Sequence, residues 1–220
     1  ILLRMRDEQG ALVSPDLFIA AAERYGLISN IDRWVVEHAF RWLVSEADER
    51  ERLALCSINL SGASLADNEF LPFVIRQFQR SGLDASKICF EITETAAIAN
   101  VERARALIEG LRAQGVRFWL DDFGSGLSSF NYLKHFPVDG LKIDGLFVRG
   151  VAKSYLDYAL VEAIQRIATT LGLSAVAEYV EGEDIAAKLR TIGVPWGQGF
   201  HLGPPKAWDA LFEAPADRPT

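Results

Sequence analysis

The stretch KICFEITETAAIANVERARALIEGLRAQGVRFWLDDFG (residues 87–124) decides the fold, because it contains a complete strand, helix and strand in succession. Its ends, residues 87–93 and 116–122, are compact apolar runs of strand length, which is typical of strands covered on both faces. Between them, residues 101–113 form a helical stretch. Two strands joined in this way are predicted to lie parallel, with the helix crossing over outside the sheet.

The same unit recurs along the chain. Further strands are predicted at residues 53–59, 140–144 and 174–180, and further helices at 15–26, 31–47, 70–80, 156–171 and 184–192. This alternation predicts an α/β domain that is either an open doubly wound sheet or a closed (β/α)₈ barrel. Each predicted strand ends in or near a polar residue, and barrels collect active sites at the carboxyl ends of several strands, so we favour the barrel. We expect one domain over residues 1–213, with a flexible tail at 214–220.

Composition restricts the classes of function. The 220 residues carry a net charge of −7, spread along the chain, which argues against a surface that binds duplex DNA or RNA. A small anionic ligand is compatible with this charge if metal ions reverse it locally. Cys56 and Cys89 lie in apolar runs and favour a reducing, cytoplasmic setting. No apolar run approaches the roughly 20 residues that span a bilayer, so we expect no membrane contact by this domain.

Polar side chains gather where the predicted strands end. Five of them offer oxygen ligands: Asn59, Glu91, Asp121, Asp122 and Glu178. Taken singly, each has a structural alternative, such as capping a turn or pairing with an arginine. Together on one rim they would repel one another unless cations lay between them, because a buried carboxylate is costly unless it is paired or bound to metal. Oxygen ligands of this type predict Mg²⁺ or Mn²⁺ rather than zinc.

The adjacent Asp121 and Asp122 can reach one site only if the chain turns there, because neighbouring residues of a strand point to opposite faces. Gly124 and Gly126 follow at once and permit such a turn. The two aspartates could then hold two metal ions, a known arrangement for attack of water on phosphate esters. Lys142 ends another strand, where it could be a surface charge, or could orient or deprotonate the water or stabilise charge on a phosphate.

These residues resemble a known family. DDFGSGLSSFNYLKHFPVDGLKID (121–144) is similar over its whole length to the signature segment of EAL-domain cyclic di-GMP phosphodiesterases. Further matches follow in order along almost the whole chain: ILLR (1–4), PDLFIAAAERYGLI (15–28), INLS (58–61), EITE (91–94), AEYVE (177–181) and QGFHLGPP (198–205). The resemblance implies a (β/α)₈-type barrel, usually dimeric, that cleaves cyclic di-GMP to linear pGpG with two Mg²⁺ or Mn²⁺ ions and is inhibited by Ca²⁺.

The resemblance also implies roles for individual residues. The five oxygen donors Asn59, Glu91, Asp121, Asp122 and Glu178 are the expected metal ligands, and Lys142, Glu178 and Asp121 the expected catalytic residues. Glu94 is expected to anchor the loop at 123–129, which links the metal site to the dimer interface. The expected substrate-binding residues are Leu2, Arg4, Asp122, Lys142, Tyr179, Glu181, Gln198 and Phe200, with Arg4 on a phosphate.

The sequence departs from the family pattern in two places, and each departure leads to an expectation. The family's Glu-Ala-Leu triplet corresponds here to a Glu immediately before Ile1, followed by Ile1 and Leu2. Because Ile1 to Leu3 read as the middle or end of a strand, we expect a piece of a longer protein that lacks its first strand and this Glu, and is impaired in catalysis by itself. Tyr179 replaces a glycine common in the family and is expected to alter the pocket floor or a base contact.

Three functions are compatible with these observations. The first is hydrolysis of cyclic di-GMP in the bacterial cytoplasm, by a homodimer with GGDEF or sensor domains upstream and a parent chain that could be anchored in the inner membrane. The second is an inactive module that binds cyclic di-GMP or a protein partner. The third is an enolase-like barrel, which also uses carboxylate ligands and a lysine base. The retained oxygen donors favour the hydrolase, and the DDFGSGLSS loop has no evident purpose in an enolase.

Overall fold

The computed structural model describes residues 1–45, 53–125 and 132–210. The predicted tail at 214–220 and part of the predicted loop at 123–129 lie outside these residues. Within them, none of the helices is long and apolar enough to cross a bilayer.

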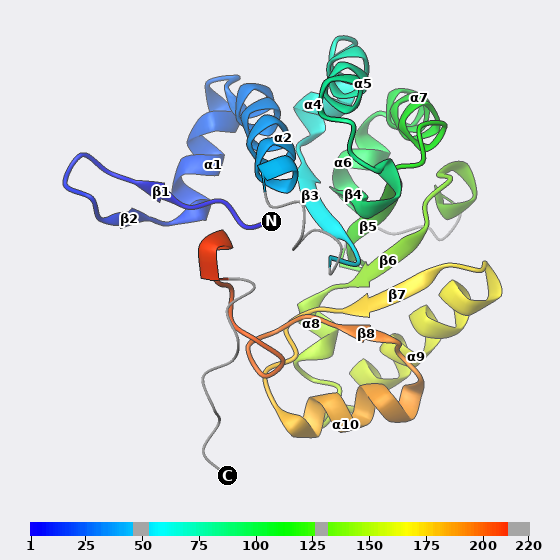
Figure 1. Ribbon diagram of the computed structural model, residues 1–220. Coiled ribbons are helices and arrows are strands. Elements are labelled where there is room, and N and C mark those ends of the chain that lie inside the picture. The colour runs from blue at the N-terminus through cyan, green and yellow to red at the C-terminus, as the bar shows by residue number, and fades with distance from the viewer. Residues whose placement is uncertain (46–52, 126–131, 211–220) are drawn as a thin grey trace.

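In the part of the chain that the structure describes, six parallel strands form one curled sheet. They follow one another in chain order: β3 (Cys56–Leu60), β4 (Ile88–Thr93), β5 (Arg117–Phe123), β6 (Gly140–Ile143), β7 (Ser174–Ala177) and β8 (Trp196–Gly197). A doubly wound sheet reverses its strand order at a switch point, whereas this order never reverses. The sheet curls with its helices on the outside, as in part of a (β/α)₈ barrel (Figure 1). The predicted α/β barrel-like fold is confirmed.

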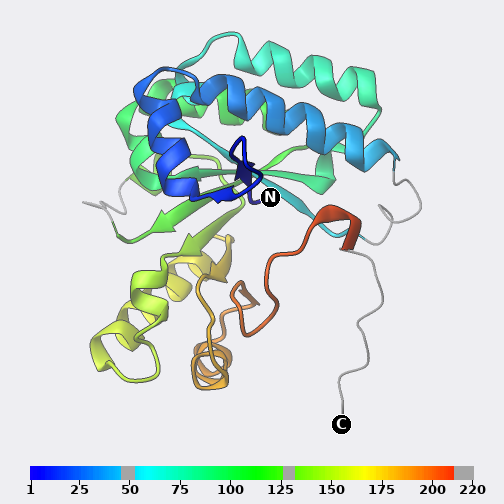
Figure 2. The ribbon, with the colours of Figure 1, turned by 90° about the vertical axis from the view of Figure 1, so that its left-hand side faces the viewer.

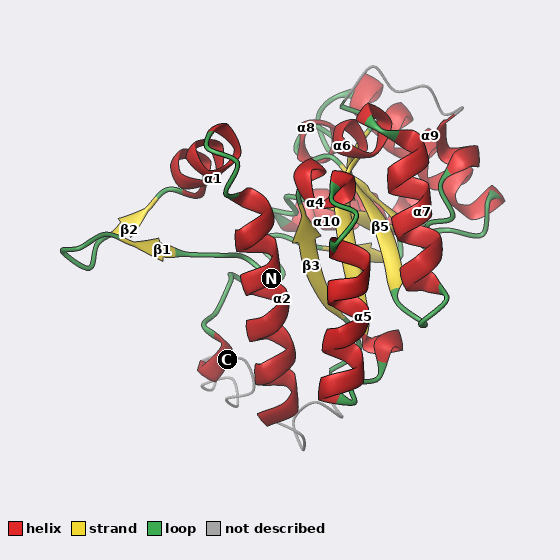
Figure 3. Cartoon of the chain, turned by 90° about the horizontal axis from the view of Figure 1, so that it is seen from above, coloured by secondary structure: helices red, strands yellow, loops and turns green. Residues whose placement is uncertain are grey.

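Long helices cover the outer face of the sheet. These are α2 (Ile28–Ser45), α5 (Phe70–Ser81), α7 (Val101–Arg112), α9 (Tyr155–Thr170) and α10 (Glu183–Ile192). Each buries an apolar stripe; that of α5 consists of Phe70, Phe73, Val74 and Phe78, and this helix ends at Gly82 in the left-handed conformation. From above, α2, α5 and α7 lie side by side over β3 to β5 (Figure 3). These five helices and strands β3 to β7 lie within three residues of their predicted bounds where the chain is described.

The core lies between the sheet and these helices. Successive strands contribute buried side chains at matching levels: Ile58, Phe90 and Phe118 are register partners, as are Leu120 and Leu141. Strand β4 is buried in five of its six residues, as expected for a central parallel strand. This packing fixes the levels at which the polar residues of neighbouring strands emerge from the sheet.

Short elements that the sequence pattern did not predict lie beside the strand ends. Helices α4 (Gly62–Ala66), α6 (Glu94–Ala99) and α8 (Gly145–Val148) begin one or two residues after β3, β4 and β6. Each is capped by the residue that precedes it, namely Ser61, Thr93 and Asp144, whose side chains accept backbone N–H groups. Helices of four to six residues are too short to show a hydrophobic period, so their capping residues are their only local signal.

The N-terminal region differs from its prediction. Residues 1–4 are not a strand; instead β1 (Met5–Arg6) and β2 (Leu12–Val13) form an antiparallel hairpin before α1 (Pro15–Arg24). The amino group of Ile1 donates to Ser57 O of β3, but a strand requires a ladder of such bonds. The hairpin projects from the body beside α1 (Figure 1) and points toward the viewer in Figure 2. At the other end, the short helix η3 (Trp208–Ala210) returns to α2, where Trp208 and Trp42 have ring centroids 4.9 Å apart.

Candidate functional site

The carboxyl ends of the strands surround one cavity of about 520 Å³. Asn59 and Glu91 are register partners on β3 and β4, and Thr93 of β4 pairs with Asp121 of β5, so all three side chains emerge at neighbouring levels. The lining includes every predicted metal-binding, catalytic and substrate-binding residue: Leu2, Arg4, Asn59, Glu91, Asp121, Asp122, Lys142, Glu178, Tyr179, Glu181, Gln198 and Phe200. The predicted convergence of strand-end side chains is therefore present.

Lys142 lies at the centre of the polar end of this cavity. Its Nζ atom is 3.0 Å from Glu91 Oε2, 2.9 Å from Asp121 Oδ1 and 2.8 Å from Glu178 Oε1. Lys142 is only 4% exposed, and Glu91 and Glu178 are buried as well. Carboxylates at or just after the ends of three strands thus converge on one ammonium from a fourth strand, an arrangement that the sequence did not specify.

Asp121 and Asp122 both reach the cavity because β5 is irregular at this point. The register between β5 and β6 shifts between Leu120 and Phe123, as in a β-bulge. Asp122 adopts φ of +53°, a left-handed conformation that few non-glycine residues take. Because of this irregularity, the two adjacent side chains do not point to opposite faces as in a regular strand. The turn was predicted after the aspartates, but the chain already departs from strand geometry at Asp122.

The charges of the site are unbalanced. Among the described lining residues, the carboxylates of Glu91, Asp121, Asp122, Glu178 and Glu181 outnumber the two cations, Lys142 and Arg4. Burial alone lowers the pKa of Lys142, but the carboxylates of Glu91, Asp121 and Glu178 outweigh it and raise that pKa, so the lysine stays charged. Burial raises the pKa of Glu178 to about 7, with Asp121 adding to the effect and Lys142 opposing it. Burial and the neighbouring carboxylates also raise the pKa of Asp122.

The donor set fits a hard divalent cation. Ligand oxygens of Asp121, Asp122 and Glu178 lie within 4.8 Å of one another. Asn59 and Glu91 add an amide and a carboxylate oxygen to the same cavity. Carboxylate and amide oxygens are the ligands that Mg²⁺ and Mn²⁺ prefer, and a cation would offset the negative charge that adds to burial in raising the pKa of Glu178.

Glu94 lies outside the cavity but contacts the loop after β5. It is the first residue of α6, only 5% exposed, and its Oε2 atom accepts the N–H of Gly124 at 3.2 Å. Gly124 has φ of +99°, which a residue with a side chain rarely adopts. This contact agrees with the predicted position of Glu94 as a loop anchor, while residues 126–129 of that loop lie outside the described residues.

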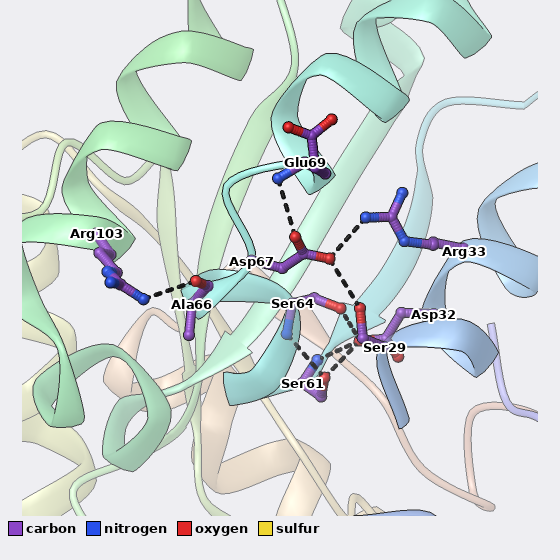
Figure 4. Close-up of polar contacts among 9 residues, drawn as sticks. All are labelled: Ser29, Asp32, Arg33, Ser61, Ser64, Ala66, Asp67, Glu69 and Arg103. Atoms are coloured by element: carbon purple, nitrogen blue, oxygen red, sulfur yellow. Dashed lines mark hydrogen bonds and ion pairs between the residues drawn. The ribbon is translucent and has the colours of Figure 1, made fainter. Parts of the chain in front are cut away.

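Asp32 supports the site and was not predicted from the sequence. Its Oδ2 atom accepts the Ser61 N–H at 2.9 Å, the Ser61 hydroxyl at 2.6 Å and the Ser64 hydroxyl at 2.7 Å (Figure 4). These bonds attach α2 to the turn that follows Asn59. The signal in the sequence was a carboxylate on a helix face whose other buried members are apolar, including Val36, Phe40 and Leu43.

Asp32→Ala is expected to destabilise the fold by about 2 kcal/mol, because three donors at the start of α4 lose their acceptor. Asp32→Asn, which keeps one oxygen, should cost less. Urea unfolding measures both. The control is Asp67→Ala, which removes bonds from Arg33, the Ser29 hydroxyl and the Glu69 N–H at a partly exposed position where water can replace them, with an expected cost below about 1 kcal/mol. Equal costs for the two alanine variants would contradict a special contribution of Asp32.

Glu178→Gln is expected to change the pH dependence of stability in the metal-free protein. Between the ordinary glutamate pKa of 4.5 and the folded pKa of about 7, the Glu178 carboxyl is ionised in the unfolded state but protonated in the folded state. Wild type therefore loses stability as pH rises through this interval. The loss is on the order of 3 kcal/mol and is absent from the variant. Urea unfolding in EDTA at pH 4.5 and pH 8 measures it, with the exposed Glu162→Gln as control. A constant difference between wild type and Glu178→Gln at both pH values would contradict this expectation.

The order of the strands and the carboxylate-lined cavity at their carboxyl ends define a barrel-type α/β protein with an acidic, cation-compatible site. The chain belongs to the EAL domain family, which matches residues 1–205. This membership removes the enolase-like alternative. It also agrees with the acidic cluster, because EAL phosphodiesterases are metal-dependent.

Three similar proteins illustrate the family. The cyclic di-GMP phosphodiesterase PdeB of Shewanella oneidensis is 42% identical over 206 residues, which are 94% of this chain and 24% of PdeB. The structure of the PaMucR phosphodiesterase in complex with c-di-GMP is 36% identical with a TM-score of 0.90, covering 96% of this chain and 85% of that one. The FimX EAL domain of Pseudomonas aeruginosa bound to c-di-GMP is 29% identical with a TM-score of 0.86, covering 93% and 82%. The chain spans about a quarter of the length of curated relatives such as PdeB.

Proposed function

We propose that this domain hydrolyses cyclic di-GMP to linear pGpG with the help of two divalent cations, Mg²⁺ or Mn²⁺. The observation that carries the proposal is the convergence of Glu91, Asp121 and Glu178 on the buried ammonium of Lys142, in a cavity that Arg4 also lines. The names of PdeB and PaMucR, both phosphodiesterases, support the same activity.

The cavity offers two environments to such a substrate. Its inner end is acidic and suits cations that bind phosphate oxygens. Its outer lining includes the cation Arg4 together with the exposed apolar side chains of Leu2 and Phe200, and the polar Gln198 and Glu181. A guanidinium binds phosphate well, and apolar and amide groups suit a nucleobase, so we assign these residues to substrate binding.

The protein's own groups would orient the reaction. When bound, divalent cations polarise the phosphodiester and lower the pKa of water. Lys142 stays protonated beside three carboxylates, so we assign it to orienting the attacking water and stabilising negative charge, not to deprotonation. Asp121 and Glu178, both in contact with Lys142, keep its ammonium at the reacting centre and complete the set of expected ligands with Asn59, Glu91 and Asp122. Attack of water on phosphorus breaks one ester bond and opens the ring.

The decisive experiment incubates the full-length protein with cyclic di-GMP and Mg²⁺ and identifies the product by mass. The expected product is heavier than the substrate by one water, which is linear pGpG. Unchanged cyclic di-GMP after prolonged incubation with Mg²⁺ or Mn²⁺ would refute the proposal. Addition of Ca²⁺ is expected to inhibit the reaction while preserving binding, because Ca²⁺ accepts the same oxygen ligands with less strict geometry.

The second candidate is a receptor that binds cyclic di-GMP without cleaving it. The structures of the FimX EAL domain and of PaMucR with c-di-GMP are of EAL domains that hold the dinucleotide, which is the observation behind this alternative. The two differ in the result of the product assay: a receptor binds cyclic di-GMP in calorimetry and leaves it intact. The presence of every expected oxygen donor within one cavity favours the hydrolase.

Further properties of the whole protein follow from its family and form part of the proposal. They are a homodimer that communicates with the site through the loop anchored by Glu94, GGDEF or sensor domains upstream, and action in the cytoplasm from a parent chain that could be anchored in the inner membrane. The contact of Glu94 with Gly124 supports the first of these. Light scattering of the full-length protein, with and without cyclic di-GMP, tests the dimer.

A further inference from the structure

Tyr179 has a strained backbone in the wall of the cavity. Its φ is +52°, in a region that bulky residues rarely occupy, and it directly follows the buried Glu178. Neighbouring main-chain bonds fix this conformation: Glu178 N–H donates to Ile143 O at 3.2 Å and Val180 N–H donates to Gln198 O at 3.0 Å. Strain that the surrounding structure maintains at a site is a reason to look for a function of that side chain.

The conformation places the Tyr179 ring on the short helix α8. The guanidinium carbon of Arg149 lies 4.0 Å from the ring centroid, over the face of the ring. Gly145 also touches the ring, and a side chain at that position would overlap it. Gly145 and Arg149 are four residues apart, so both lie on the same side of α8 and support the ring from behind.

Tyr179 is also accessible from the cavity. The tyrosine is 46% exposed and lines the cavity, whereas α8 contributes none of the described lining residues. An aromatic ring that is held from one side and open on the other, at the edge of a polar site, is the usual arrangement for stacking a planar ligand.

We propose that Tyr179, backed by Arg149 and seated on Gly145, is a platform on which one purine base of the substrate stacks. This inference rests on the proposed function and extends it to the recognition of the base. The cation on the far face withdraws electron density from the ring, which favours stacking of an electron-rich purine on the near face. The platform is already ordered before the ligand arrives, so little conformational entropy is lost on binding.

The test compares steady-state kinetics of wild type, Tyr179→Ala and Tyr179→Phe in the full-length protein. With cyclic di-GMP, the alanine variant should show a KM raised by roughly 5- to 100-fold, with a smaller change in kcat, because the stacking partner of the base is lost. Phenylalanine should stay close to wild type, because stacking needs the ring and not the hydroxyl. Mn²⁺ affinity, measured by calorimetry without substrate, should be unchanged in the alanine variant, because the ring is not among the oxygen ligands.

Tyr155→Ala is the matched control, because Tyr155 is 88% exposed on α9 and lies outside the cavity lining. An unchanged KM in Tyr179→Ala, an equal loss in Tyr179→Phe, or a matching loss of Mn²⁺ affinity in Tyr179→Ala would each overturn the platform. Absence of turnover in wild type counts against the hydrolase instead. In that case, calorimetry of the same variants with cyclic di-GMP and Ca²⁺ tests the platform by itself, with the same expected loss of affinity.

Discussion

Lys142→Ala in the full-length protein is expected to lower turnover of cyclic di-GMP by about 10²- to 10⁴-fold, the range of a positioned proton-transfer or charge-stabilising group. The physical reason is the position of its ammonium, within 3.0 Å of Glu91, Asp121 and Glu178. The same substitution leaves these buried carboxylates without their shared cation. In EDTA we therefore expect a loss of about 3–5 kcal/mol in the free energy of unfolding.

Turnover at saturating substrate and calorimetric unfolding measure the two effects of Lys142→Ala. Mg²⁺ should raise the unfolding temperature of the variant more than that of wild type, since the cation replaces the missing positive charge. This second measurement separates a catalytic loss from simple unfolding. Lys188→Ala, on the exposed face of α10, is the control and should keep wild-type turnover. Wild-type turnover in Lys142→Ala would remove Lys142 from the proposed machinery.

Asp121→Asn is expected to weaken Mn²⁺ binding by at least about 100-fold and to reduce turnover by a similar factor. Asparagine keeps the size of the side chain and one oxygen but loses the negative charge that lies among Asp122, Glu178 and Lys142. Mutation of a residue that only supports a metal ligand lowers metal affinity by roughly 10- to 100-fold. Mutation of a direct ligand is expected to lower it further.

Titration calorimetry with Mn²⁺ alone measures the effect of Asp121→Asn without any dependence on turnover. Asp16→Asn, in the exposed first turn of α1, is the control because it makes the same chemical change away from the cavity. Equal Mn²⁺ affinity in wild type and Asp121→Asn would show that Asp121 is not a ligand. The variant should keep its fold in EDTA, since it lowers the repulsion between Asp121 and Asp122.

Much of the fold follows from local patterns. The strand at 87–93 and the helix at 101–113 carry their period within their own residues, and the structure places β4 and α7 there. The hairpin before α1 was missed, and Ile1 to Leu3 were assigned wrongly to a strand. Both segments are too short for their residues to indicate their structure. An apolar triplet does not show whether a partner strand is available for main-chain hydrogen bonding, and two-residue strands are too short to show alternation.

The candidate site could be predicted as a set of residues but not as a geometry. Asn59, Glu91 and Asp121 could be recognised in the sequence as polar residues at the ends of predicted strands. Parallel strands bring such ends to one edge of the sheet, so their convergence could be predicted. The support that Asp32 gives to the turn after Asn59 was not visible, because its partners lie 29 and 32 residues away along the chain. Nor could the sequence show that β5 bulges at Asp121 and Asp122.

The amino-acid sequence by itself determined the alternation of strands and helices, the acidic character of the strand ends and the family. These are properties of residue type and spacing, which can be recognised in the sequence alone. Only the tertiary structure decided that Lys142 is shared by three carboxylates, that Glu178 keeps its proton to a pKa of about 7 in the metal-free protein, and that Tyr179 lies on Arg149. Charge interaction, desolvation and ring packing depend on distances between residues remote in the chain, and those distances exist only once the sheet has curled.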